Sequence, residues 1–173
     1  MKNIVLIGMP AVGKSTIGVL LAKVMLYHFC DTDLLLQQNC GCSLCDYIEH
    51  HGTTDFIRFE CETLASLHLQ NTVIATGGSA VYGERAMQNL KETGIVVYLK
   101  NDPETIKSRI GNIVSRGVVF LHGASVEDIC RERTPLYEKY ADITIDCNDL
   151  SSEECVNQIV RALSLYHYNT NIK

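Results

Sequence analysis

The chain has no run of lysine or arginine residues. Its 173 residues include 15 basic and 20 acidic side chains, so the formal net charge at pH 7 is −5. Proteins that hold nucleic acid or anionic lipid by charge carry a basic patch. The sequence therefore argues against both partners and leaves room only for a local cationic pocket. Apolar residues make up 46% of the chain, which excludes a disordered protein.

Long apolar runs are missing as well. No stretch approaches the roughly 20 residues that a helix needs to cross a membrane. Residues 1–8 contain a short apolar run without the longer apolar core and the cleavage site of a signal peptide. These absences predict a cytoplasmic protein that does not bind membranes. Disulfides are rare in that compartment, so the eight cysteines are expected to be mostly reduced thiols.

Internal repeats, low-complexity segments and linkers are also absent, and the length fits one domain of the usual ~100–200 residues. Five short apolar segments indicate strands: 4–7, 29–30, 72–76, 95–99 and 143–145. Helical spacing follows Lys14, covers about 43–70 with a break near Gly52, and returns at 156–163. This alternation predicts an α/β fold with a parallel sheet. The segment 111–124 has no clear period and is expected to be a mobile loop.

A glycine-rich motif at residues 8–15 joins the first strand to the first helix. It reads Gly-Met-Pro-Ala-Val-Gly-Lys-Ser and fits G-x-x-x-x-G-K-[ST], the phosphate-binding P-loop. Backbone N–H groups of such a loop converge on an anion, while Lys14 can reach the β- and γ-phosphates and Ser15 can ligate Mg²⁺. The expected nucleotide-binding residues are Gly8, Pro10, Ala11, Val12, Gly13, Lys14, Ser15 and Thr16.

Two carboxylates, Asp31 and Asp33, follow the second strand at the edge where α/β sheets bind ligands. On an extended segment these two side chains are expected to point in different directions. One of them then holds the water shell of Mg²⁺, and the other receives the proton of an acceptor hydroxyl. The alternative is a structural role, with Asp33 as the N-cap of a helix that begins at Leu34.

Further motifs accompany the P-loop at fixed separations. They are Lys14-Ser15-Thr16-Ile17-Gly18, Asp31-Thr32-Asp33, Gly77-Gly78-Ser79, Arg133-Thr134-Pro135-Leu136-Tyr137 and Tyr140-Ala141-Asp142. Many NTPases share the P-loop, whereas its combination with D-T-D and R-x-P-L-Y is more specific. With these motifs the chain resembles the shikimate kinase family from Ile4 to about Leu163.

This resemblance implies one P-loop kinase domain over residues 1–173, with a five-stranded parallel sheet flanked by helices as in nucleoside monophosphate kinases. It further implies an ATP–Mg²⁺ site, an acceptor-binding helical region at about 32–70 and a lid loop at about 111–124. Members of the family are cytoplasmic or plastid enzymes and often monomers, so a cytoplasmic monomer is expected here.

The resemblance also implies roles for individual residues. Lys14 contacts the phosphates, while Ser15 and Asp31 serve Mg²⁺. Asp33 contacts the acceptor hydroxyl, and Arg133 holds the acceptor carboxylate.

The acceptor side departs from the family pattern. Counted without gaps from Asp33, Phe56 matches the family's phenylalanine, and Ile57 falls on its substrate-binding arginine. Arg58 comes one place late, which is a rotation of about 100° on a helix, and it stays a candidate acceptor-binding residue. Ser79 replaces the third glycine of the family's turn, where it would intrude or supply a hydroxyl. The other expected acceptor-binding residues are Asp33, Gly77, Gly78 and Arg133.

Two arginines lie near the expected lid. Arg116 comes one place later than the family's lid arginine, a shift that a loop accommodates more easily than a helix. It is expected to stabilise the transferring phosphoryl group, and it completes a catalytic set with Lys14 and Asp33. Arg109 precedes the loop and is the neighbour of the family's adenine-stacking arginine, so it counts as nucleotide-binding.

Other residues allow two interpretations. Cys40, Cys42 and Cys45 invite a zinc site, but no fourth ligand is obvious, so packed apolar thiols are the preferred interpretation. Glu60 matches an acidic position of the family that orients an arginine. Its partner can be Arg58 or Arg133.

These observations predict a kinase. It would transfer the γ-phosphoryl group of ATP to a hydroxyl of a small metabolite that carries a carboxylate, with shikimate as the leading candidate. The alternatives are a different hydroxy acid or hydroxy amino acid as acceptor, or a nucleotide-binding module without acceptor chemistry. Asp33 and Arg133 argue against a module, because ATP binding alone requires neither residue.

Overall fold

The computed structural model describes residues 2–110 and 125–170, and it contains one five-stranded sheet. The strands are β1 (Asn3–Ile7), β2 (His28–Asp31), β3 (Thr72–Ala75), β4 (Gly94–Lys100) and β5 (Ile143–Asp146). Their order is β2-β3-β1-β4-β5, and every neighbouring pair is parallel. Both the five predicted strands and the parallel α/β fold are therefore confirmed. All five strands end at one edge of the sheet, the carboxyl edge.

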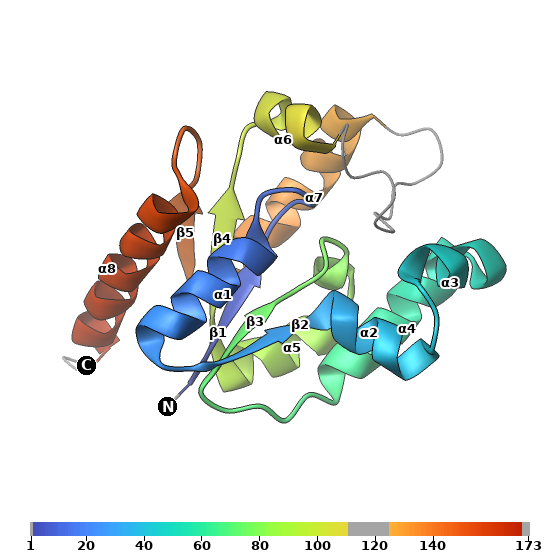
Figure 1. Cartoon of the computed structure of the whole chain (residues 1–173), viewed down its shortest axis with the longest axis horizontal. Coiled ribbons are helices and arrows are strands. Elements are labelled where there is room, and N and C mark those ends of the chain that lie inside the picture. Colours follow the sequence, from blue (N-terminus) through green and yellow to red (C-terminus); the bar gives the residue numbers. More distant parts are fainter. Residues whose placement is uncertain (1, 111–124, 171–173) are drawn as a thin grey trace.

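Helices follow the strands and flank the sheet (Figure 1). They are α1 (Lys14–Met25), α2 (Thr32–Cys40), α3 (Leu44–His51), α4 (Thr53–Ala65), α5 (Glu84–Thr93), α6 (Pro103–Ile110), α7 (Val126–Tyr140) and α8 (Ser152–Thr170), with a 3-10 turn, η1, at Ala80–Tyr82. The break predicted near Gly52 separates α3 from α4, and Gly52 has φ +82°, a conformation that glycine adopts at little cost. The chain from 66 to 71 is not helical, so the helical stretch is shorter than expected.

The sheet has an apolar layer on each face. On one side α1 and α8 pack through residues such as Ile17, Leu21 and Ile159. On the other side α5 and α7 contribute, among others, Met87 and Tyr137. A strand that is covered on both faces is apolar throughout, and this explains the uninterrupted apolar run in β1.

The helical spacing after Lys14 predicts one apolar face made of Ile17, Leu20, Leu21, Val24 and Met25, and one of these residues lies outside this core. Val24 keeps 58% of its surface exposed, whereas Leu21 is fully buried. The helical spacing identified the correct helix and most of its buried face. Met25, the last residue of α1, still packs against this core, so Val24 is an exception within the predicted face.

Helices α2, α3 and α4 form a small cluster of their own beside β2 and β3 (Figure 1). Its buried residues are Leu36, Leu44 and Phe56, one from each helix. Ser43 begins α3 as its N-cap and accepts a hydrogen bond from the backbone of Asp46. This separate packing gives the acceptor-binding region expected at about 32–70 its own small core, joined to the sheet through α4.

The cysteines of the described residues are all free thiols. Cys130, Cys147 and Cys155 are buried, while Cys40 and Cys42 are half-buried with sulfur atoms 3.6 Å apart. Within residues 2–110 and 125–170, no group of three or more His, Cys, Asp or Glu side chains is placed to hold a metal ion. Cys40, Cys42 and Cys45 are therefore not gathered into such a group in this part of the chain.

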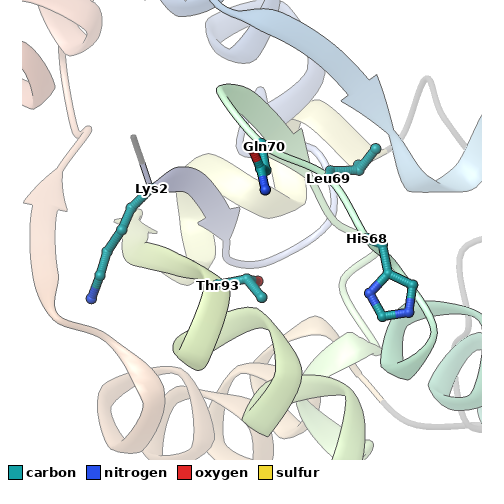
Figure 2. Close-up of a pocket in the computed structure, with 5 residues that line it drawn as sticks. All are labelled: Lys2, His68, Leu69, Gln70 and Thr93. Carbon is teal, nitrogen blue, oxygen red and sulfur yellow. The ribbon is translucent and has the colours of Figure 1, made fainter.

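A cavity of about 500 Å³ lies at the amino edge of the sheet, opposite the P-loop (Figure 2). It is lined by Lys2, His68, Leu69, Gln70 and Thr93, which precede β1, β3 and β4.

Among the described helices, none is long and apolar enough to span a bilayer.

Candidate active site

The P-loop connects β1 to α1 at the carboxyl edge of the sheet. Gly8 has φ +146°, and a Cβ atom built on it would lie 2.5 Å from the carbonyl oxygen of Leu99. Only glycine fits this turn, because β4 passes so close to it. Ala11 at the tip of the loop also has a positive φ of 65°. A non-glycine residue in that region costs energy and often marks a functional site.

Lys14 is folded back over the loop that it follows. Its Nζ donates hydrogen bonds of 2.8 Å to the carbonyl oxygens of Gly8 and Met9, and its exposed fraction is 8%. Burial lowers the pKa of the ammonium group to about 8, and the positive charge of Arg133 lowers it further, while Asp33 opposes the shift. These two hydrogen bonds hold the ammonium group against the loop, where phosphates would bind.

Asp31 and Asp33 differ in their surroundings. Asp31 is the last residue of β2 and the N-cap of α2, and its Oδ1 accepts a 3.0 Å hydrogen bond from the backbone of Asp33. Burial, followed by the charge of Asp31, raises the pKa of the Asp33 carboxyl. Thr32 lies between them, and its hydroxyl accepts a 3.1 Å hydrogen bond from the backbone of Gly77.

The expectation of an extended segment at Asp31–Asp33 was wrong. The helix begins at Thr32, so the capping role belongs to Asp31 instead of Asp33. A strand would have placed both carboxylates on one face, because side chains alternate along a strand. The start of the helix separates them, and they serve different neighbours for that reason.

The turn after β3 brings α2 and α4 together. A Cβ atom built on Gly77 would overlap Oε1 of Glu60 and would lie 2.9 Å from Oδ1 of Asp33. The carboxyl groups of Glu60 and Asp33 therefore converge on the one point where this turn has no side chain.

Glu60 is fully buried, with an exposed fraction of 1%. Its Oε2 accepts a 2.6 Å hydrogen bond from the hydroxyl of Ser79, while Oε1 has no hydrogen-bond partner among the described residues. Burial raises the pKa of this carboxyl to about 7, against the hydrogen bond from Ser79. The sequence analysis missed this pair, although it recognised that Ser79 brings a hydroxyl to the turn.

Arg133 is buried in α7, with an exposed fraction of 1%. Its Nε donates a 3.0 Å hydrogen bond to the hydroxyl of Tyr82, and its guanidinium carbon lies 5.2 Å from the centre of the Tyr82 ring. A Cβ atom built on Gly78 would lie 3.1 Å from Nη1, so the cation faces the glycine turn. Tyr137 donates a 2.7 Å hydrogen bond to the carbonyl oxygen of Gly78.

Both tyrosines flank the arginine, and neither was a predicted site residue. Tyr137 belongs to the quoted R-x-P-L-Y motif, which could have identified it. Tyr82 carries no motif signal of its own, because only the fold places η1 against α7.

Arg58 does not join this cluster. It pairs with Asp55 one turn earlier on α4, and 69% of its side chain is exposed. Tyr47 donates a 2.9 Å hydrogen bond to the same aspartate. Ile57 is half-buried and carries no charge. The partner of Glu60 is thus Ser79 instead of Arg58, while Arg133 acts on Glu60 through its charge.

The remaining candidates lie near the end of α6. Arg109 is in the last turn of this helix. The helix itself lies at the same edge of the sheet as the P-loop (Figure 1). Arg116 and the lid expected at 111–124 lie outside the described residues.

The site therefore unites four buried or half-buried charged groups from separate elements: Lys14, Asp33, Glu60 and Arg133. A P-loop provides backbone donors for phosphates. Next to it lie a carboxylate that can take a proton and a buried guanidinium that can hold an anion.

Comparisons with known proteins agree with this geometry. The family model of shikimate kinase matches residues 10–164. Shikimate kinase from Caldanaerobacter subterraneus subsp. tengcongensis is 34% identical over 165 residues, covering 94% of this chain and 96% of the relative. Shikimate kinase from Vibrio vulnificus is 33% identical with the same coverage.

Solved structures give the same result. Shikimate kinase from Acinetobacter baumannii, in complex with shikimate, superposes with a TM-score of 0.87 at 27% identity, covering 96% of this chain and 94% of that one. The enzyme from Aquifex aeolicus gives a TM-score of 0.81 at 31% identity, covering 94% and 96%. The fold is thus that of P-loop kinases, and the chain belongs to the shikimate kinase family of phosphotransferases.

Proposed function

We propose that the protein transfers the γ-phosphoryl group of ATP to a hydroxyl of shikimate, forming shikimate 3-phosphate and ADP. The observation that carries the proposal is the placement of Asp33 and Arg133 beside the P-loop lysine, in one buried charge cluster. A nucleotide-binding module would need neither. The family relationship and the shikimate complex of the Acinetobacter baumannii enzyme support shikimate as the acceptor.

The residues divide the reaction among them. The acceptor oxygen forms a bond to the γ-phosphorus as the bond from that phosphorus to the β,γ-bridging oxygen breaks, and ADP leaves. Asp33 receives the hydroxyl proton, and its raised pKa suits it to this task. Lys14 neutralises charge on the phosphates, and Arg133 holds the acceptor carboxylate.

Ser15 and Asp31 suit a magnesium ion. Both offer hard oxygen donors at the mouth of the P-loop, and Asp31 uses Oδ1 to cap α2. Magnesium is held by one or two protein groups together with phosphates and water, so this small donor set fits it. When bound, the ion would neutralise charge on the phosphates. We further propose that Arg109 contacts the nucleotide, that Arg116 acts from the lid, and that the enzyme is a cytoplasmic monomer of one domain.

A coupled assay of ADP release tests the proposal. Purified protein, ATP and Mg²⁺ are combined with shikimate and with a panel of other hydroxy acids and hydroxy amino acids. We expect shikimate to be phosphorylated and a water-only control to release almost no ADP. Nucleotide binding without ADP release for any acceptor would instead support the binding module, and turnover of another acceptor alone would replace shikimate.

A further inference from the structure

The buried Oε1 atom of Glu60 is unusual for a folded protein. Buried polar atoms nearly always have a partner, and a carboxylate oxygen left without a donor is costly. The other oxygen of the same group is held by Ser79 at 2.6 Å. Glu60 is thus half satisfied by the protein, with one oxygen left for another donor.

The free oxygen is buried at Gly77, beside the carboxylate expected to take the acceptor's proton. It lies against Gly77, and Oδ1 of Asp33 lies against the same glycine. A hydroxyl that gives its proton to Asp33 would therefore sit beside Oε1 of Glu60. A second donor on the neighbouring carbon of the acceptor is the group that this oxygen can reach.

No cation of α4 takes the place of that donor. Ile57 is uncharged, and Arg58 is paired with Asp55 and mostly exposed. Arg133 donates a hydrogen bond to Tyr82, and its charge acts on Glu60, whose Oε1 still has no hydrogen-bond partner among the described residues. The departures at Ile57 and Ser79 both change the surroundings of Glu60. Ile57 replaces an arginine that could pair with this carboxylate, and Ser79 supplies a neutral donor to Oε2 alone.

We propose that Glu60 is an acceptor-binding residue whose Oε1 accepts a hydrogen bond from a donor adjacent to the reacting hydroxyl, while Ser79 fixes Oε2. This inference rests on the proposed function and adds the class of acceptor. The acceptor carries a carboxylate for Arg133 and an O–H or N–H group next to the hydroxyl that is phosphorylated. A vicinal diol, as in shikimate, or a vicinal hydroxy amine meets this description.

The test combines one substitution with a matched change in the acceptor. Binding of shikimate, of analogues that each lack one non-reacting hydroxyl, and of an analogue with an amine in place of the neighbouring hydroxyl is measured by calorimetry at pH 8. The proteins are wild type and Glu60→Gln. Glu62→Gln, an exposed glutamate on the same helix, is the control. Turnover is recorded in parallel.

We expect Glu60→Gln to weaken shikimate binding about 10- to 100-fold, as for a hydrogen bond to a charged group. Nucleotide affinity should not change. Wild type should bind the analogue that lacks the neighbouring hydroxyl more weakly than shikimate, by a similar factor. Glu60→Gln should bind that analogue as tightly as it binds shikimate. Wild type should bind the amine analogue at least as tightly as shikimate, because an ammonium group can also donate a hydrogen bond to Oε1.

Other outcomes overturn the inference. If Glu60→Gln weakens the binding of shikimate and of every analogue by the same factor, or if wild type binds the analogue that lacks the neighbouring hydroxyl as tightly as shikimate, Oε1 does not contact the acceptor. Shikimate turnover by wild type would still stand in either case, so the two proposals fail separately. Ser79→Ala guards against misfolding of Glu60→Gln, because it keeps the carboxylate and releases Oε2. It should weaken binding several-fold only for acceptors that keep the neighbouring donor, and a thermal unfolding curve is recorded for each variant.

Discussion

The phosphate side and the acceptor side of this site are built in different ways. The phosphate side is one continuous loop, residues 8–15, and it offers mainly backbone groups together with Lys14. The acceptor side is assembled from α2, α4, the turn after β3 and α7, and it offers side chains. A backbone cradle offers the same donors whatever side chains stand at its positions other than the required glycines and Lys14, whereas a set of side chains can change its ligand by single substitutions.

The electrostatics of the two sides differ as well. Lys14 donates hydrogen bonds to carbonyl oxygens of its own loop, which are uncharged. On the acceptor side, Asp33 and Glu60 carry like charges over Gly77, and Arg133 provides the opposite charge. Selectivity for the acceptor therefore depends on a balance of buried charges, which the nucleotide does not require.

The largest effect is expected on the phosphate side. Lys14→Met should reduce turnover by up to about 10³-fold while the fold persists, because it removes charge stabilisation of the phosphates and keeps the apolar stem. Circular dichroism and the ADP-release assay measure both quantities. Lys23→Met, an exposed lysine on the same helix, serves as the control. More than about a tenth of the wild-type rate would remove Lys14 from the mechanism.

The two aspartates should respond differently. Asp33→Asn should lower turnover about 10²-fold with nearly unchanged nucleotide affinity, because the proton acceptor is lost. Asp31→Asn should raise the Mg²⁺ concentration needed for half-maximal rate. A Mg²⁺ titration of both variants separates these roles. Identical titration curves would mean that the two carboxylates act as one unit.

The acceptor side is tested by its two arginines. Arg133→Ala should lower kcat/KM by about 30-fold or more for carboxylate-bearing acceptors, since truncation of a buried charge partner costs ~2 kcal/mol or more. Arg58→Ala should change it less than about twofold, because the exposed pair with Asp55 contributes little. An acceptor without a carboxylate should lose less with Arg133→Ala. Equal losses for both variants would return Arg58 to the acceptor site.

The same contrast explains what the sequence could predict. The five strands and the P-loop are local patterns, and the structure confirms them because burial on both faces and the glycine turn act within a few neighbouring residues. Arg58 was kept as a candidate acceptor-binding residue, but the structure pairs it with Asp55 and leaves 69% of its side chain exposed, because one position on a helix turns a side chain by about 100°. The pair of Glu60 and Ser79, 19 residues apart, forms only when the turn after β3 meets α4.

Burial of Glu60 predicts a pH effect on stability. Its pKa rises from the ordinary value of 4.5 to about 7 in the folded protein. The folded state thus binds a proton that the unfolded chain releases in this range. The resulting stabilisation is complete below pH 4.5 and is lost as the pH rises through 7.

Denaturant unfolding of wild type and Glu60→Gln at several pH values measures this difference. Between pH 4.5 and 7, the free energy of unfolding of wild type should fall by up to about 3 kcal/mol relative to Glu60→Gln. Parallel pH profiles for the two proteins would show that the carboxyl titrates as it does in the unfolded chain.

The smallest effect is expected at Tyr82, which sharpens the comparison within the acceptor side itself. Tyr82→Phe removes the hydroxyl that accepts from Nε of Arg133 at 3.0 Å and donates to Glu132 at 2.7 Å, but it keeps the ring beneath the guanidinium. Arg133 then loses one of the hydrogen bonds that hold its guanidinium in place. This loss should raise the KM of a carboxylate acceptor several-fold, with kcat and nucleotide KM unchanged. In an Arg133→Ala background the same substitution should have almost no further effect, because Tyr82 acts through that arginine. An equal effect in both backgrounds would assign Tyr82 a structural role unrelated to the acceptor.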